Sequence, residues 1–239
     1  MSSLPPNACR MRVRYIKDGR LAYLGHLEVM ETVMRSIRRA HLPFEVSNGF
    51  AHRMRIQFSQ ALPVGAASRG EYYDLLLAEP LDVQEALGLL RESTPASIAP
   101  QEARLLPRRV PALEAWVGLS CWSVDVVAPG VDAATFDQKL EDVRERGAIE
   151  YMRGQKPKRI ELARTLVSCK AKDTDQGTRL LLQTRSTERG SLRPAILVNA
   201  VCGCTPLRVC RDAQWHEEPD GTLVDPMQIT LGANPERSE

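Results

Sequence analysis

The sequence predicts an α+β protein made of two tandem ferredoxin-like domains, each with βαββαβ order and an antiparallel sheet. Alternating apolar residues indicate strands, and apolar residues at helical spacing indicate amphipathic helices. The same order of elements occurs once in each half of the 239-residue chain. Pro107 and Pro111 lie between the halves and are typical of a linker. We therefore expect domains at residues 8–107 and 112–217 and a flexible tail at 218–239; one continuous α+β domain is the alternative.

The first half supports this order element by element. Met30, Val33 and Ile37 repeat at the spacing of one helix face, and Pro43 follows. Asp82 is a plausible N-cap for the second helix. We expect a strand at 11–24, a helix at 26–43, strands at 52–60 and 71–79, a helix at 82–93 and a strand at 96–106.

The second half repeats the order without clear residue identity. Phe136, Leu140 and Val143 lie on one side of its first helix, and Gly147 ends that helix. We expect a strand at 115–128, a helix at 132–147, strands at 158–172 and 178–186, a short helix at 192–201 and a strand at 206–218.

Composition favours an ordinary globular protein. Charged residues make up 26% of the chain and the formal net charge is +2. Apolar runs are too short for a membrane span and the start lacks an apolar signal core, so we expect a cytoplasmic location. In that location we expect the six cysteines to be mostly reduced thiols. Cys202 and Cys204 are close in sequence, but their spacing is not that of a metal site. We expect neither a metal site nor a cofactor.

Positive charge is concentrated in the first half. Residues 10–69 hold eleven basic and four acidic side chains, a local net of +7. Arg12 and Arg14 lie two residues apart and share one face of a strand. Two interpretations stay open. The arginines form a phosphate-binding groove, or they are solvated or paired, with Arg14 against Glu71 or Asp74.

Two further segments extend the basic character. Residues 152–159 form a basic loop that either is a mobile surface loop or clamps a nucleic-acid backbone. Arg185, Arg189 and Arg193 flank Gly190 and Ser191 ahead of a helix, whose N-terminus attracts anions. The candidate residues for nucleic-acid contact are Arg12, Arg14, Lys17, Arg38, Arg39, Phe50, Arg53, Arg55, Lys156, Lys158 and Arg193.

Two histidines are the candidates for catalysis. His26 opens the first helix and His52 follows the Asn48-Gly49 turn. A histidine pair beside an arginine could cleave RNA through its 2′-hydroxyl, by analogy with other tandem ferredoxin-like proteins. We favour a structural role for His26, and contact with a ligand is a further alternative.

Several ordered motifs resemble a known family. They are RVRYIKDG at 12–19, LGHLE at 24–28, RRAHLP at 38–43, SNGF at 47–50, ALPVG at 61–65, EYYD at 71–74 and GSLRPAILVNAV at 190–201. Together they resemble the radical SAM-linked protein family, whose members are fused to or encoded beside cobalamin-binding radical SAM proteins. Gly25 and Glu28 depart from that family's Ser-His-Leu-Asp, and His52 and Met54 stand where prolines are expected.

The resemblance implies an accessory role beside a radical SAM enzyme and supplies no reaction of its own. With the basic residues, it leads us to expect a non-catalytic accessory or substrate-binding protein that binds RNA through a basic groove. A metal-independent ribonuclease using His26 and His52 is one alternative. A protein-only adaptor for the radical SAM enzyme is the other.

Overall fold

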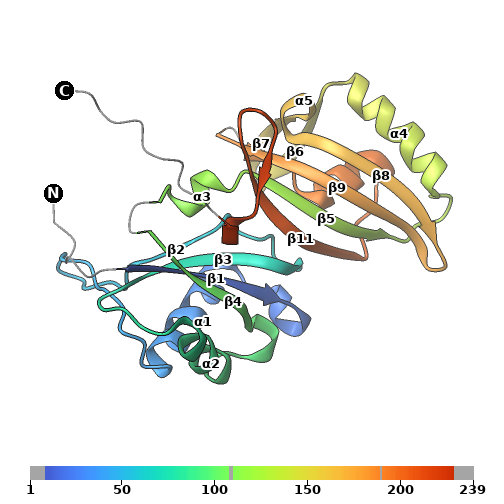
Figure 1. The fold of residues 1–239 in the computed structure, drawn as a ribbon. Helices are drawn as coiled ribbons and strands as arrows, with labels where there is room; N and C mark the ends of the chain where they lie inside the picture. Colours follow the sequence, from blue (N-terminus) through green and yellow to red (C-terminus); the bar gives the residue numbers. More distant parts are fainter. Residues whose placement is uncertain (1–8, 108–109, 189, 229–239) are drawn as a thin grey trace, which may run out of the picture.

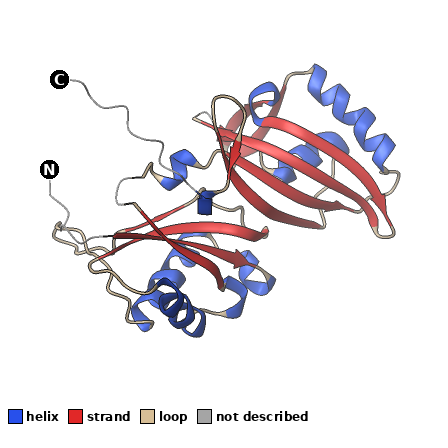
Figure 2. Cartoon of the chain, viewed as in Figure 1, coloured by secondary structure: helices blue, strands red, loops and turns tan. Residues whose placement is uncertain are grey.

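The protein has a mixed α+β fold in which most strands belong to one large, mostly antiparallel sheet. A computed structural model describes residues 9–107, 110–188 and 190–228. Figures 1 and 2 show two groups of strands, each with helices packed against it. The α+β prediction is confirmed at this level. No helix within the described ranges is long and apolar enough to cross a membrane.

The first half follows the predicted order of elements. Its elements are β1 (Cys9–Lys17), η1 (Gly19–Tyr23), α1 (His26–Arg39), β2 (Ile56–Phe58), β3 (Ala67–Leu77), α2 (Val83–Ser93), η2 (Ala96–Ile98) and β4 (Pro100–Leu106). The strand predicted at 11–24 ends early because Asp18 caps the turn of η1 and Gly19 has a φ of 59°. Asp82 caps α2 as predicted, by accepting hydrogen bonds from the backbone of Gln84 and Glu85.

The second half contains more elements than the sequence suggested. They are α3 (Leu113–Trp116), β5 (Leu119–Val126), α4 (Ala133–Glu145), β6 (Ala148–Arg153), β7 (Lys156–Glu161), α5 (Leu162–Thr165), β8 (Leu166–Thr174), β9 (Gly177–Thr187), β10 (Gly190–Ser191), α6 (Pro194–Cys202), β11 (Arg208–Glu217), β12 (Leu223–Val224) and η3 (Pro226–Gln228). The strand predicted at 158–172 is wrong as one element, because β7, α5 and β8 share that segment.

The two halves share one sheet. Its strand order is β10-β9-β5-β11-β3-β1-β4, with β2 on β3, β8 on β9 and β12 on β11. The halves join where β11 runs parallel to β3 and pairs Cys210 with Ala67 and Arg211 with Ser68. The other strand pairs within the described ranges are antiparallel. The two halves therefore share one sheet, and the prediction of two separate ferredoxin-like sheets is not confirmed.

Each half nevertheless buries its own hydrophobic cluster. In the first half, α1 and α2 cover one face of β1 and β3 (Figure 1), and Val33 and Ile37 meet Met11 and Leu75 there. The second cluster lies between α4, α6 and the β5–β9 strands and includes Phe136, Leu140, Leu180 and Val198. Burial of these apolar faces stabilises both halves.

Part of the predicted flexible tail is packed against the first half. Met227 in η3 is buried, and the Pro226 carbonyl accepts a hydrogen bond from Arg12 Nη1 at 2.9 Å. β12 pairs with the end of β11. Within the predicted tail at 218–239, β12 and η3 are therefore paired or packed, and residues 229–239 lie outside the described part.

Candidate nucleic-acid interface

Arg12 is a buried structural residue. Its Nε and Nη2 donate to the two Asp74 carboxylate oxygens at 2.6 and 2.8 Å. Both side chains have no exposed surface, because η3 and Trp116 cover the face of the sheet opposite α1 and α2. The predicted RNA contact by Arg12 is therefore wrong, because no part of its guanidinium reaches the surface.

Lys17 and Arg14 are also held by protein groups. Lys17 is buried and its Nζ donates to the Leu24 carbonyl at 2.8 Å. Burial lowers the pKa of Lys17, with the Glu71 carboxylate partly opposing that shift. Arg14 pairs with Glu102 at 3.2 Å. Its charge is thus paired, as one of the two interpretations held, but the partner is neither Glu71 nor Asp74. Lys17 is therefore excluded as a surface contact, and Arg14 is half-buried.

The arginines at the end of α1 remain at the surface. Arg38 lies over the Phe44 ring, with 6.0 Å from its guanidinium carbon to the ring centroid. Arg39 donates from Nη1 to the Ser93 carbonyl at 3.0 Å. Both side chains are exposed. Contact between these two arginines and RNA stays a prediction.

The segment after α1 forms a projecting tip. Phe50 is fully exposed at 106% of its reference surface, and Arg53 is exposed beside it. Arg55 pairs with Glu45 at 3.2 Å, so its charge is offset. This tip lies at the opposite side of the molecule from the β6–β7 hairpin (Figure 1). Arg53 and Phe50 are thus available for contact, but they are not part of the groove described below.

His26 and His52 are not joined by any contact within the described chain. His26 is half-buried at the start of α1, and its ring meets the Phe58 ring edge-on with centroids 5.9 Å apart. His52 is exposed in the tip with a φ of 40°. The ring packing of His26 fits the structural interpretation, which we favoured.

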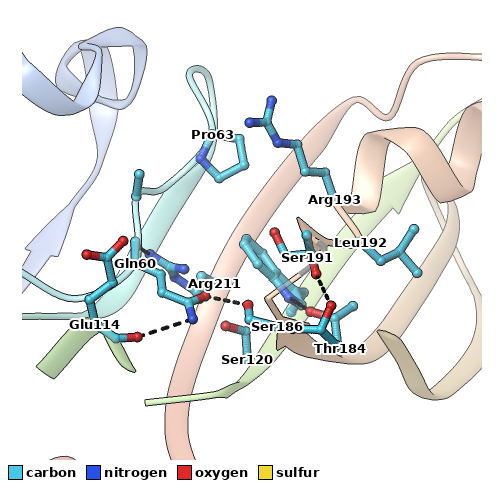
Figure 3. A pocket seen from close by; sticks show the side chains of 14 residues that line it. Gln60, Pro63, Glu114, Ser120, Thr184, Ser186, Ser191, Leu192, Arg193 and Arg211 are labelled. Carbon is cyan, nitrogen blue, oxygen red and sulfur yellow. Dashed lines mark hydrogen bonds between the residues drawn. The ribbon is translucent and has the colours of Figure 1, made fainter. Parts of the chain in front are cut away.

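A polar pocket of about 280 Å³ lies between the two halves. Its floor comes from β5, β9 and β11, and its rim from the segment after β2 and the segment before α6 (Figure 3). The first half contributes Gln60 and Pro63, and Arg193 stands at the opposite rim. We call this the inter-half pocket; its lining residues are Gln60, Ala61, Pro63, Glu114, Ser120, Trp122, Thr184, Ser186, Thr187, Gly190, Ser191, Leu192, Arg193 and Arg211.

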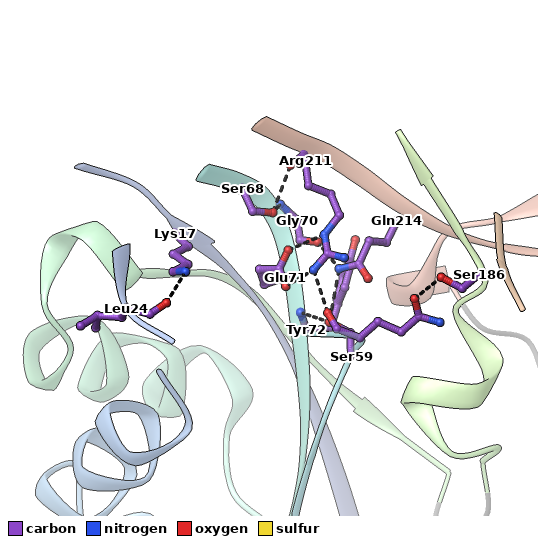
Figure 4. Close-up of polar contacts among 11 residues, drawn as sticks. Lys17, Leu24, Ser59, Ser68, Gly70, Glu71, Tyr72, Ser186, Arg211 and Gln214 are labelled. Atoms are coloured by element: carbon purple, nitrogen blue, oxygen red, sulfur yellow. Dashed lines mark hydrogen bonds and ion pairs between the residues drawn. The ribbon is translucent and has the colours of Figure 1, made fainter. Parts of the chain in front are cut away.

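Arg211 fixes the position of this pocket relative to the first half. From β11, its Nε and Nη2 donate to the Glu71 carboxylate at 2.8 and 2.5 Å, and Nη2 also donates to the Gln60 carbonyl at 2.8 Å (Figure 4). Arg211 and Glu71 are almost fully buried. Its remaining nitrogen, Nη1, makes no hydrogen bond with the described residues. Arg211 was not among the site residues expected from the sequence, because only the strand pairing brings it to Glu71.

A second recess continues the inter-half pocket toward the β6–β7 hairpin. The two depressions share Thr187 and Gly190, and the second is lined by Arg159 and Arg164. Arg159 also lines two further depressions along the hairpin. We call the inter-half pocket, this recess and the hairpin together the basic groove.

Exposed cations follow the hairpin part of the basic groove. Arg153, Lys156 and Lys158 make no ion pair within the described ranges. Arg159 lies 3.9 Å from Glu150, and Arg164 pairs with Glu161 at 3.1 Å. Exposed pairs of this kind are weak, so these guanidiniums can turn toward an anion. Of the predicted residues, Arg193 lines the inter-half pocket, and Lys158 lines a hairpin depression beside Arg159, with Lys156 on the same strand. Arg185 is engaged by Glu217, and Arg189 lies outside the described residues.

Metal-ligating side chains and cysteine thiols are further candidates for a reactive site. The described ranges contain no group of three or more His, Cys, Asp or Glu side chains placed to hold a metal ion. Burial raises the pKa of Cys169 to about 12 and that of Cys210 to about 11, which keeps both thiols protonated at neutral pH.

Comparison with known proteins places the chain in a family. Residues 10–194 match the family described as "Uncharacterized protein conserved in bacteria (DUF2344)". The chain belongs to this family. No curated protein matches its sequence.

One solved structure is similar only at a low level. The crystal structure of an unknown protein from Galdieria sulphuraria aligns over 75% of this chain and 81% of its own, with 10% sequence identity and a TM-score of 0.26. A similarity of this size supports no statement about fold or function.

Proposed function

We propose that this protein is a non-catalytic accessory or substrate-binding protein that holds RNA along the basic groove. The observation that carries the proposal is the continuity of the groove: the inter-half pocket shares Thr187 and Gly190 with the recess at Arg159 and Arg164. Exposed lysines and arginines along such a surface bind phosphates without base specificity. The location of the site differs from the first-half cluster, because several of those arginines are paired or buried.

The test is RNA binding by fluorescence anisotropy over a salt series, with total transfer RNA as the probe. Each phosphate contact to a single strand contributes about −0.7 to the slope of log K against log salt, so Lys156→Ala/Lys158→Ala should flatten the slope by about 1.4. Lys170→Ala/Lys172→Ala removes the same charge from exposed positions on β8 and should leave the slope unchanged. Equal slopes for both double variants would place the RNA elsewhere.

The first-half tip provides an internal comparison. Arg53→Ala/Arg55→Ala changes two arginines that lie outside the basic groove. If this double variant alone weakens binding, RNA contacts the tip and the groove assignment fails. If correctly folded protein binds no RNA at low salt, the whole proposal fails.

We infer that the partner is a radical SAM enzyme, as the sequence resemblance implies. One surface feature supports docking to a protein: Tyr23, Leu27 and Val64 are 72%, 73% and 64% exposed. Tyr23 lies against Gly65, which follows Val64, and Leu27 follows Tyr23 by four residues in the chain. An exposed apolar patch of this kind is typical of a docking site, and it also suits the adaptor alternative.

Co-purification distinguishes the adaptor from the RNA-binding protein. An adaptor should retain the radical SAM partner after nuclease treatment and in high salt, and Leu27→Asp should release it. Leu223→Asp, which places a charge on an exposed apolar residue of β12, is the matched control. Loss of the partner on nuclease treatment would favour an RNA bridge and count against the adaptor.

We also infer that both halves derive from one βαββαβ plan. Supporting this, β4-β1-β3 with β2 on β3 repeats the arrangement of β11-β5-β9 with β8 on β9. In this interpretation the β6–β7 hairpin is an addition to the second copy, and it carries much of the positive charge of the basic groove.

A further inference from the structure

The inter-half pocket differs in charge from the hairpin part of the basic groove. Arg211 is offset by Glu71, with which it forms two hydrogen bonds, and the lining adds one further cation, Arg193, and one anion, Glu114. The pocket is thus close to neutral, while Arg153, Lys156 and Lys158 make the hairpin cationic. A ligand that spans both parts should have a neutral end and a phosphate backbone.

Hydroxyl groups dominate the pocket walls. Thr184 accepts a hydrogen bond from Trp122 Nε1 at 2.9 Å, Ser186 donates to Gln60, and Thr187 donates to the Gly190 carbonyl at 2.8 Å. Ser120 and Ser191 have no such partner among the described residues, and neither does Arg211 Nη1. The pocket therefore offers hydroxyls that donate and accept, and one guanidinium nitrogen that donates.

These groups match the two adjacent hydroxyls of a terminal ribose. Each ribose hydroxyl donates one hydrogen bond and accepts others, so it can pair with the serine hydroxyls and with the arginine. The volume of about 280 Å³ is close to the lower end of the ~300–1,000 Å³ common for small-molecule pockets, which suits one nucleoside.

The position of the charges indicates which part of an RNA enters. A nucleotide inside a chain has a phosphate on both sides, and the recess that adjoins the pocket at Thr187 and Gly190 carries two further cations, Arg159 and Arg164, on one of these sides. The other side is bounded by Gln60, Pro63 and Glu114. A 5′-phosphorylated end would bring a dianion into a pocket that has no net positive charge.

We propose that the inter-half pocket receives the 3′-terminal nucleoside of a single-stranded RNA. The ribose diol contacts Ser120, Ser191 and Arg211 Nη1, and the preceding phosphates leave over Thr187 and Gly190 toward the hairpin. The proposal rests on the proposed RNA-binding function and adds the part of the RNA that is recognised. It makes the protein a reader of free 3′ ends.

The experiment compares one short single-stranded RNA in three forms, measured by fluorescence anisotropy. The forms carry a 3′-hydroxyl, carry a 3′-phosphate, or are circular, with the label in the middle of the chain. The 3′-phosphate and circular forms should bind at least roughly tenfold more weakly, because they lose the hydrogen bonds of the free 3′-hydroxyl to the serine hydroxyls and Arg211 Nη1. Ser191→Trp, which fills the pocket from its rim, should reduce the 3′-hydroxyl form to the same level. Gln176→Trp on the exposed β8–β9 turn should not.

Each outcome decides a different point. Equal, salt-dependent binding of all three forms would overturn the end-recognition proposal and leave the RNA-binding function standing. No binding of any form by folded protein would overturn both. Adenosine 5′-monophosphate serves as a competitor. If its dissociation constant equals that of the RNA, the proposal is also overturned, because contacts between the hairpin and the preceding phosphates would then add no affinity.

Discussion

The ion pair between Arg211 and Glu71 should contribute strongly to stability, because it joins the two halves in a buried position. The side chains are 2% and 4% exposed. Removing one partner of a buried pair costs about 3–5 kcal/mol, since the other charge stays buried without compensation. Arg211→Leu should therefore lower the free energy of unfolding by about 3–5 kcal/mol. At roughly 2–4 °C per kcal/mol for a chain of this size, Tm should fall by about 6–20 °C.

The assay is urea unfolding followed by tryptophan fluorescence and circular dichroism. The double variant Glu71→Leu/Arg211→Leu should recover much of the lost free energy of unfolding, because it removes both charges. The recovery should be incomplete by about 1–3 kcal/mol, because the Gln60 carbonyl still lacks its donor. Arg14→Leu is the control: its pair with Glu102 is 35% and 50% exposed and should contribute about 0–1 kcal/mol. An Arg211→Leu protein as stable as Arg14→Leu would refute the reasoning, and so would a double variant weaker than either single variant.

Three further predictions follow from local contacts. Asp82→Ala removes the α2 cap and should lower the free energy of unfolding by about 1 kcal/mol in the same urea assay. Met227→Ala should lower the free energy of unfolding by about 2–5 kcal/mol, because this η3 side chain is buried against Tyr72 and Leu113; a neutral effect would show that η3 does not pack. Burial raises the pKa of Cys210 to about 11, so its thiol stays protonated at pH 8 and iodoacetamide should label it only after unfolding, as read by mass spectrometry.

Local patterns predicted most of the helices and the central strands. The periodicity of Val33 and Ile37 and the cap at Asp82 identify α1 and α2, because these features depend only on nearby residues. The strands β1 and β3 were also expected, and they pair as antiparallel neighbours. The residue opposite Asp74 is Arg12, however, and not Arg14 as the sequence suggested.

The candidate site was predicted less well, for physical reasons. Alternation in a strand predicts on which face of the sheet Arg12 lies, but not which segment covers that face. The covering segment, η3, lies more than two hundred residues further along the chain. The hairpin at Gly154 was interpreted as a loop because basic residues hide the alternation of Ile149 and Tyr151. That alternation and the glycine were the signals that could have identified it.

The parallel pairing of β11 with β3 has a consequence for synthesis on the ribosome. The first half is made early and can collapse around its own cluster, but the β3 edge at Ala67 and Ser68 waits for a strand that emerges some 140 residues later. During this interval an unpaired edge and the Glu71 carboxylate are open to other chains. Nascent chains that stall before β11 are therefore the ones from which we expect association between copies, and completion of the last long strand closes the edge.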